Sequence, residues 1–351
     1  MSWTHDTLGQ RVRMATGTAA EALAEEVDRL GARRVMVVAG PAEASLAATV
    51  TAGLPVALRH DEVVMHVPVE VAERAREAAT AAAVDAVVTV GGGSTTGLGK
   101  AVALTSGLPL LAVPTTYAGS EATDVWGLTE GAVKTTGSDL RVLPRTVVYD
   151  ATLLTGLPRH LSVASGLNAL AHCVDSLWAP RADPVNAALA GEGARALAAG
   201  LPAVAADPDD LRARELTIQG AYLAAVSFAS AGSGLHHKIC HVLGGRYDLP
   251  HAETHATVLP HVLALNAPQA PAADERLAAA FGSPTGLAGL QRLRAELDAP
   301  RALRDHGFRE EDIPDAVAAV LPVVPPSNPT PVTTENLTAL LRAVWEGADP
   351  S

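Results

Sequence analysis

The chain is short of lysine, cysteine and aromatic residues, and each shortage excludes something. Its 351 residues include three lysines, two cysteines and 3% aromatic residues. Two cysteines far apart in the sequence cannot build a disulfide framework. Acidic residues outnumber basic ones by 38 to 26, and the net charge of −12 argues against a nucleic-acid partner. An anionic small molecule is not excluded, because a pocket can be locally positive inside a negative protein.

Long apolar runs are lacking as well. No uncharged apolar stretch has the length of a membrane span. The first residues, MSWTHD, have neither the basic region nor the apolar region of a secretory signal. We therefore expect a cytoplasmic protein with no membrane partner.

The first 150 residues alternate short apolar runs with segments of helical spacing. Three runs of aliphatic and β-branched residues that end at glycine or proline predict strands at 34–39, 85–90 and 110–113. An Ala/Glu/Arg-rich stretch at 69–84 predicts a helix, with Pro68 just before its start. Strands that alternate with helices indicate a parallel sheet covered by helices, here a Rossmann-like nucleotide-binding domain.

Beyond residue 150 the strand signals fade and helical patterns follow one another. Helices are predicted at 162–178, 184–206, 211–229, 255–266, 287–297, 311–320 and 334–346. Short breaks rich in proline and glycine separate them, which is typical of an all-α domain. The sequence thus predicts an α/β domain over 1–150 and an all-helical substrate and catalytic domain over 151–351.

Glycines and hydroxyl residues follow the second predicted strand and open a helix, in the run GGGSTTGLGK over 91–100. Gly92 and Gly93 let the backbone approach a phosphate, the helix N-terminus offers N–H groups, and Ser94 and Thr95 add hydroxyls. The spacing matches neither the dinucleotide fingerprint nor the P-loop. A tight turn alone would explain one glycine, but three glycines and three hydroxyls exceed that need. We expect phosphate binding here.

A second loop of this type follows the next strand and reads PTTYAGSE over 114–121. Open α/β sheets bind ligands beyond the carboxyl ends of their strands. An ordinary connecting turn would explain this loop taken alone. Two such loops on successive strands favour a nucleotide over a single phosphate.

Histidine is in excess, with twelve in the chain and six of them between residues 236 and 261. Asn168 and His172 are four residues apart, as are His237 and His241, so each pair lies on one face of a helix. With His251, such a set suits metal binding or proton transfer near neutral pH. A lone histidine is more often structural, and we place three others on helix surfaces or behind the site: His236, His255 and His261.

The residue at position 168 bears on the metal question. Three neutral imidazoles usually need an anionic partner to hold a divalent cation, and carboxylates help to retain Fe(II). Asn168 offers only a neutral amide oxygen. We therefore expect no bound metal.

Six segments together resemble the iron-containing alcohol dehydrogenase superfamily, and within it the maleylacetate reductases. They are GGGSTTGLGKA (91–101), PTTYAGSE (114–121), WGLTEGAVKTTG (126–137), VLPRTVVYD (142–150), SGLNALAHCVDSLWA (165–179) and GLHHKICHVLGGRYDLPHAETHATVLPH (234–261). The resemblance covers essentially the whole chain. It implies the fold shared by iron-type alcohol dehydrogenases and dehydroquinate synthase, and a homodimer.

The resemblance also implies a ligand set and a cofactor. The superfamily pattern Asp-His-His-His falls on Asn168, His172, His237 and His251, with His241 as the nearby pocket histidine, and asparagine forms work without metal. NADH or NADPH would lie in a cleft between the domains, with its pyrophosphate on the glycine loop. The residues expected around the rest of it are Thr115, Thr116, Tyr117, Ser120 and Lys134.

The family reaction reduces the C=C bond of maleylacetate, a small anionic substrate, to 3-oxoadipate. Hydride addition to an alkene conjugated with a ketone develops an enolate, which needs hydrogen-bond donors rather than a strong Lewis acid. Protonated His241 or His172, with Lys238 nearby, would supply the donor and the proton. Cationic groups would hold the substrate's carboxylates.

One segment departs from the family pattern. Before the last helix the family carries an aromatic residue and an arginine, whereas this chain reads VPPSNPTPVT over 324–333, with Thr330 in the arginine's place. The substrate could therefore be a related unsaturated dicarboxylate or enone. Two alternatives stay open: a metal-dependent (iron or zinc) alcohol or aldehyde dehydrogenase, and a scaffold repurposed for lyase or cyclase chemistry or for ligand binding.

Overall fold

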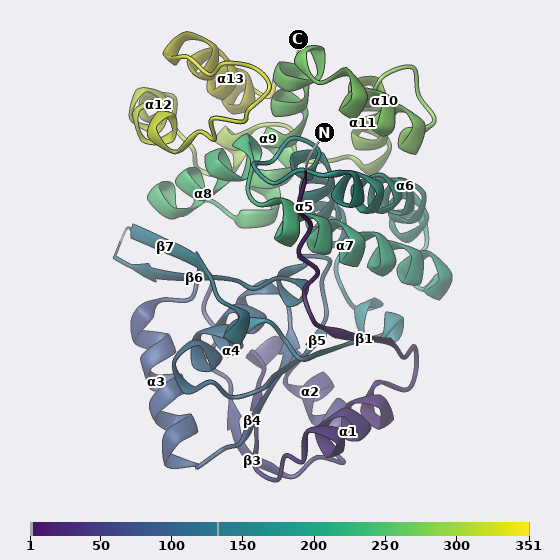
Figure 1. The fold of residues 1–351 in the computed structure, drawn as a ribbon, viewed down its shortest axis with the longest axis vertical. Coiled ribbons are helices and arrows are strands. Elements are labelled where there is room, and N and C mark those ends of the chain that lie inside the picture. The colour runs from purple at the N-terminus through teal and green to yellow at the C-terminus, as the bar shows by residue number, and fades with distance from the viewer. Residues whose placement is uncertain (1–2, 132, 351) are drawn as a thin grey trace. The chain divides into compact units, whose positions relative to one another are not determined.

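The chain forms two compact units, which Figure 1 shows as a ribbon. The computed structural model describes residues 3–131 and 133–350, with the backbone alone at positions 133 and 134. One unit spans Leu8–Leu157, and the other contains residues 3–7 together with the chain from Pro158 onward. The division falls a few residues beyond the expected boundary at residue 150, because Leu153 still packs against the core of the first unit.

The first unit is built on a six-stranded parallel sheet of order β1-β8-β5-β4-β2-β3. Its strands are β1 (Arg11–Met14), β2 (Val35–Val38), β3 (Val56–His60), β4 (Ala86–Gly91), β5 (Leu110–Pro114) and β8 (Thr146–Tyr149). The three predicted strands are confirmed as β2, β4 and β5. The edge strands β1 and β3 were not predicted, because their partly exposed residues form no continuous apolar run.

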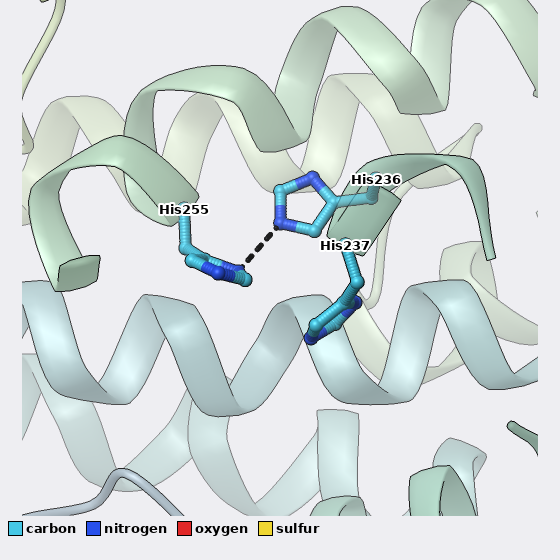
Figure 2. A group of neighbouring side chains, drawn as sticks. All are labelled: His236, His237 and His255. Carbon is cyan, nitrogen blue, oxygen red and sulfur yellow. Dashed lines mark hydrogen bonds between the residues drawn. The ribbon is translucent and has the colours of Figure 1, made fainter. Parts of the chain in front are cut away.

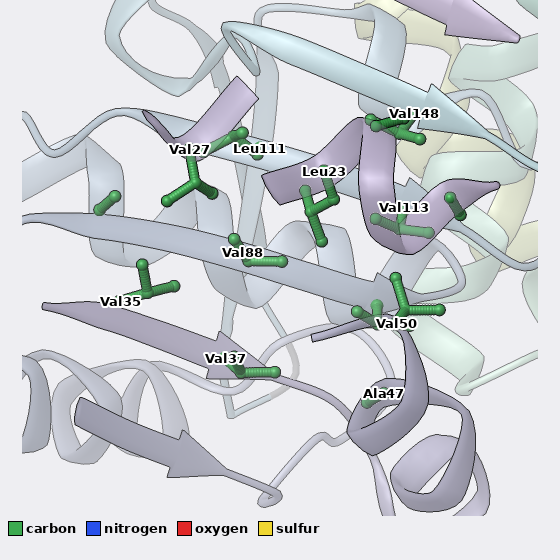
Figure 3. Close-up of a cluster of buried hydrophobic side chains, with 14 of the residues drawn as sticks. Leu23, Val27, Val35, Val37, Ala47, Val50, Val88, Leu111, Val113 and Val148 are labelled. Atoms are coloured by element: carbon green, nitrogen blue, oxygen red, sulfur yellow. The ribbon is translucent and has the colours of Figure 1, made fainter. Parts of the chain in front are cut away.

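Helices cover both faces of this sheet, and alternate residues of each strand supply the two cores. On one face Val35 and Val37 pack with α1 (Ala19–Leu30) and α2 (Ala44–Val50), as Figure 3 shows. On the other face Met36 and Val38 pack with α3 (Val69–Ala81) and α4 (Gly93–Ser106). A strand buried on both faces is apolar at nearly every position, with Thr89 of β4 as an exception, and this is the pattern that identified β2, β4 and β5.

An antiparallel hairpin interrupts the alternation of strands and helices between β5 and β8. Its strands are β6 (Val125–Glu130) and β7 (Val133–Ser138). Trp126 lies opposite Gly137, where a Cβ would come within 2.6 Å of the indole ring, so glycine leaves room for the ring. This hairpin was not predicted, because β6 is only partly buried and has no apolar run.

The second unit is helical throughout its described part, as predicted. Its α-helices are α5 (Arg159–Ser176), α6 (Pro184–Ala206), α7 (Leu211–Ala231), α8 (Leu235–Tyr247), α9 (His251–Asn266), α10 (Pro271–Phe281), α11 (Gly286–Leu297), α12 (Ile313–Val320) and α13 (Thr334–Glu346). Helix α9 begins at His251 and not at residue 255 as predicted. A buried core that includes Leu243, Val262 and Leu341 joins α8, α9, α12 and α13.

Acidic side chains mark the start of two of these helices. Asp183 accepts hydrogen bonds from the N–H groups of Val185 and Asn186 at the start of α6, and Asp210 accepts one from Ala213 at the start of α7. Such caps satisfy N–H groups that have no partner inside the helix. Helix α8 follows Gly234, which has no side chain that could act in this way.

None of the described helices combines the length and the apolar character needed to cross a bilayer.

Candidate functional site

The glycine loop joins β4 to α4, where the sequence predicted it. Gly91 has a φ of 154°, and a side chain there would collide with Thr95, so this position needs glycine. Gly92 is the N-cap of α4, and no side chain caps the helix. The N–H groups of the first turn therefore stay available to an anion, beside Gly93 and Ser94.

The threonine loop that follows β5 lies directly against the glycine loop. Gly91 pairs with Pro114, and the N–H of Thr115 donates to the carbonyl oxygen of Gly91 at 3.1 Å. A Cβ added at Gly92 would lie 3.0 Å from the Thr116 methyl group. The structure thus brings the two predicted loops together at the carboxyl ends of neighbouring parallel strands.

The predicted cofactor residues in the threonine loop differ in exposure. Thr116 and Ser120 are partly exposed, whereas Thr115 and Tyr117 are buried at 7% and 1% exposure. Ser120 opens a short 3-10 turn, Ser120–Ala122, after Gly119, whose φ is 77°. The predicted cofactor residue Lys134 belongs to β7 by its backbone, but its side chain lies outside the described part of the structure.

In the helical unit, three helices bring the predicted histidines together. Asn168 and His172 come from α5, His237 and His241 from α8, and His251 from α9. The rings of His172 and His237 stack with centroids 4.9 Å apart, and His241 lies edge-on to His237 at 5.9 Å. These contacts join histidines from distant parts of the sequence into one cluster, in which His172 and His237 are buried and His241 and His251 partly buried.

The prediction that His236 and His255 could lie on helix surfaces is wrong. Both are fully buried, and they share a hydrogen bond of 3.0 Å between Nε2 of His236 and Nδ1 of His255. Figure 2 shows these rings and that of His237 turned toward one another. His255 also contacts His251, with ring centroids 4.3 Å apart. His261 is buried as well, at 6% exposure, so a surface place is wrong for it too.

The signal for His255 lay in the sequence. His251 and His255 are four residues apart, and they share a helix face once α9 is seen to begin directly after Pro250. A helix that begins at residue 255, as predicted, does not contain His251, so the spacing did not indicate that His251 and His255 lie together.

Burial makes most of these imidazoles hard to protonate. It lowers the pKa of His172 to about 4, and burial together with neighbouring histidines lowers the pKa of His236 to about 3. Burial and the other histidines also hold the pKa values of His237 and His255 well below the usual value of 6.5. The expectation of a protonated His172 is therefore wrong near neutral pH, where this ring is neutral.

Sequence reasoning missed one acidic residue of the cluster, Asp175. Its carboxylate is fully buried on α5, and Oδ2 lies 2.8 Å from Nδ1 of His237. Burial raises the pKa of Asp175 to about 6. Its spacing of three residues from His172 on the same helix was the available signal.

The donor set does not fit the iron that the family name implies. At the position where the superfamily has an Asp ligand, this chain has the buried amide of Asn168, which brings no negative charge. Among the described residues, the three histidines whose ligand atoms lie within 4.8 Å of one another are His236, His237 and His255, a group without a carboxylate. Without a carboxylate, these donors suit a hard cation such as Fe(II) poorly.

The departing loop before α13 is tied to the end of α9. Asn266 and Asn328 exchange two amide hydrogen bonds of 2.9 Å, and the Thr330 hydroxyl donates to the Leu265 carbonyl oxygen at 2.6 Å. The threonine that stands in the arginine's place is thus a structural tie and brings no positive charge.

Two family profiles match most of the chain. One, described as iron-containing alcohol dehydrogenase, matches residues 10–151. The other, described as the C-terminal part of the Fe-containing alcohol dehydrogenase family, matches residues 162–345.

Curated relatives match over nearly the full length. A maleylacetate reductase from Delftia acidovorans is 43% identical over 352 residues, which cover 100% of this chain and 99% of that protein. A maleylacetate reductase from Burkholderia cepacia is 44% identical over 333 residues, 94% of each chain.

Solved structures agree with the fold. The crystal structure of an iron-containing alcohol dehydrogenase from Corynebacterium glutamicum has a TM-score of 0.98 at 60% identity, covering 100% of this chain and 98% of that chain. That of a maleylacetate reductase from Agrobacterium tumefaciens has a TM-score of 0.93 at 41% identity and covers 100% of both chains.

Proposed function

Because the chain belongs to the iron-containing alcohol dehydrogenase family, we propose that it is a reductase of maleylacetate or a related unsaturated dicarboxylate. It uses NADH or NADPH to reduce a C=C bond and needs no metal. The full-length similarity to maleylacetate reductases supports the reaction. The observation that carries the metal-independent form is the buried, uncharged amide of Asn168 on α5, at the position where the superfamily has an Asp ligand.

The two loops at the carboxyl ends of β4 and β5 are assigned to the cofactor. The uncapped N-terminus of α4, with Gly92, Gly93 and Ser94, binds the pyrophosphate through N–H groups and the helix dipole. Thr116 and Ser120 are accessible for hydrogen bonds, while the buried Thr95, Thr115 and Tyr117 support the two loops. When bound, the reduced nicotinamide supplies the hydride. Lys134 keeps its predicted role next to the cofactor.

In the helical unit, His241 is assigned to proton donation. Hydride addition to the alkene carbon farther from the ketone leaves an enolate, and one proton completes the reduction of the C=C bond to a single bond. The buried His172 and His237 are neutral near pH 7, so they cannot act as imidazolium acids. His241 is only partly buried and lies beside them, which suits a residue that exchanges protons.

Lys238 is assigned to a substrate carboxylate. It is partly exposed on α8, next to His237 in sequence and one helical turn from His241. Thr330 carries no charge and is tied to the end of α9, so the cation that would pair with a carboxylate has to come from elsewhere.

The test is to follow oxidation of NADH and of NADPH with maleylacetate, with related unsaturated dicarboxylates, and with simple aldehydes. We expect turnover of an unsaturated dicarboxylate that survives EDTA, with no stoichiometric iron or zinc in the protein. Activity on aldehydes alone, lost on chelation, would instead support a metal-dependent alcohol dehydrogenase. The protein that is 60% identical is described as an iron-containing alcohol dehydrogenase. A homodimer and a cytoplasmic location stay predictions from the sequence.

A further inference from the structure

The Asp175 carboxylate is placed to act on two neighbours at once. It projects from α5 and accepts hydrogen bonds from the N–H groups of Gly234 at 2.9 Å, His237 at 3.3 Å and His236 at 3.4 Å. These are first-turn groups of α8, whose N-cap is a glycine. Asp175 therefore supplies from another helix the cap that Gly234 cannot make.

Gly234 is required for this arrangement. A Cβ at residue 234 would overlap the Asp175 carboxylate, so even alanine would push this carboxylate away from the first turn of α8. The glycine that cannot cap its own helix thus leaves room for the carboxylate that caps it.

The second contact of Asp175 is with the ring of His237. An ionised carboxylate can only accept hydrogen bonds, so Nδ1 of His237, 2.8 Å from Oδ2, must carry the proton. In a neutral ring Nε2 then holds a bare lone pair. Nε2 of His237 is buried and makes no hydrogen bond within the described part of the chain.

The ring of His237 is also held in orientation by its neighbours. It stacks on His172 at 4.9 Å with an interplanar angle of 16°, and Phe228 of α7 lies 4.3 Å away on a tilted plane. Packing on two sides and a hydrogen bond on Nδ1 leave the direction of Nε2 little freedom.

We infer that Asp175 is a positioning residue that keeps His237 in the Nδ1–H tautomer, so that Nε2 acts as an acceptor in the site. Resting on the proposed reduction, this divides the work among the histidines. His237 accepts a hydrogen bond from a substrate group, and it cannot donate to the developing enolate oxygen. That donor role then falls to His241.

A simple helix cap and a tautomer-setting residue predict different behaviour for variants of Asp175. One oxygen, Oδ2, faces Nδ1 of His237 and also the N–H groups of Gly234 and His237, so an amide oxygen in that place keeps all three contacts in Asp175→Asn. Asp175→Ala removes the acceptor of Nδ1, so the His237 proton is free to move to Nε2, which turns an acceptor into a donor. Carboxylates that orient histidines typically change activity by about 10–100-fold or more when replaced.

The experiment compares Asp175→Ala with Asp175→Asn and with Asp210→Ala, which removes a cap of α7 that has no histidine contact. For Asp175→Ala we expect unchanged NADH binding and a fall of kcat by about tenfold or more. For Asp175→Asn we expect most of the activity to remain. For Asp210→Ala we expect unchanged kcat.

A spectroscopic readout tests the tautomer apart from catalysis. Two-bond ¹H–¹⁵N correlation spectra of histidine-labelled protein near pH 8, where aspartates are ionised, identify which nitrogen of a ring is protonated. The His237 signals are assigned as those missing from His237→Gln. We expect Nδ1–H in wild type and in Asp175→Asn, and Nε2–H in part of the Asp175→Ala molecules.

An Nε2–H tautomer in wild type overturns the inference, and so does a changed tautomer in Asp175→Ala with wild-type kcat. If Asp175→Ala does not fold, the spectra of wild type and Asp175→Asn decide, because both must show Nδ1–H. If the wild type oxidises neither NADH nor NADPH with any enone, the proposed function fails, while the spectra still test the role of Asp175.

Discussion

The ammonium group of Lys100 is fully buried at the end of the glycine-loop segment. Its Nζ donates to the carbonyl oxygens of Thr123 at 2.8 Å and Val125 at 2.7 Å, and to the Thr123 hydroxyl at 3.0 Å. Burial lowers its pKa to about 7. The three oxygen acceptors around Nζ suit a compact ammonium group better than a flat guanidinium group. This explains why position 100 is a lysine in a chain whose basic residues are mostly arginines.

Lys100→Met should lower the free energy of unfolding by about 2–4 kcal/mol, because two buried carbonyl oxygens lose their donor. Urea denaturation of the purified variant measures this. Lys100→Arg should also destabilise, since the larger head group does not fit among the three acceptors. Wild-type stability in Lys100→Arg would show that charge, and not ammonium geometry, matters at this position.

His241→Ala should lower kcat by about 10² or more if this ring donates the proton. Turnover with the best unsaturated substrate and saturating NADH or NADPH is the measurement. His160→Ala is the matched control, because His160 is an exposed histidine at the start of α5. Near-wild-type turnover in His241→Ala would remove the assigned role.

At the scale of elements, the strand, loop and helix that end at the N-terminus of α4 can be predicted from local sequence. Residues 85–100 alone contain the apolar run of β4, the glycines that end it and the start of α4. Helix α8 differs, because its start depends on a carboxylate from α5 that is 62 residues from His237 in the sequence.

Gly93→Val should weaken binding of the reduced nicotinamide cofactor by about tenfold or more, which corresponds to about 1.4 kcal/mol of binding free energy. The branched side chain of valine would occupy the space in which the backbone approaches the phosphates. A fluorescence titration with NADH and NADPH measures it. Gly93→Ala is the control, since its Cβ would meet Ala118 at an ordinary 3.4 Å and add less bulk. Equal affinity for Gly93→Val and wild type would contradict phosphate binding at this loop.

At the scale of the whole molecule, buried histidines make stability depend on pH. His172, His236 and His261 have pKa values of about 4, 3 and 4 in the folded protein, all lowered chiefly by burial. Between about pH 6.5, the unfolded value, and about pH 4, the unfolded chain binds more protons than the folded one. Stability is therefore complete above this window and falls as the pH falls through it. Asp175, whose pKa is raised to about 6, offsets part of the effect.

Urea midpoints measured from about pH 7.5 down to about pH 5 should decrease steadily. Each such histidine contributes about 1.4 kcal/mol per pH unit within the window. His261→Gln removes one of these groups, and we expect a shallower slope in that variant. A stability that is flat or rises toward pH 5 would show that the buried rings titrate together with compensating groups.

The sequence by itself determined the local parts of this protein. Short, mostly apolar runs specify β2, β4 and β5, because a strand buried on both faces is apolar at nearly every position. Glycines and hydroxyls after two successive strands located the two loops, and parallel strands bring their carboxyl ends to one edge of the sheet. The pairs Asn168/His172 and His237/His241 followed from helical spacing alone.

The tertiary structure decided which side chains from separate helices meet. No local period shows that His236 of α8 bonds His255 of α9, or that Asp175 of α5 caps α8 and binds His237. Helical spacing defines a face, but packing between residues far apart in the chain selects what that face contacts. Burial then shifts the pKa values that separate a neutral acceptor from a proton donor, and burial is a property of the folded chain.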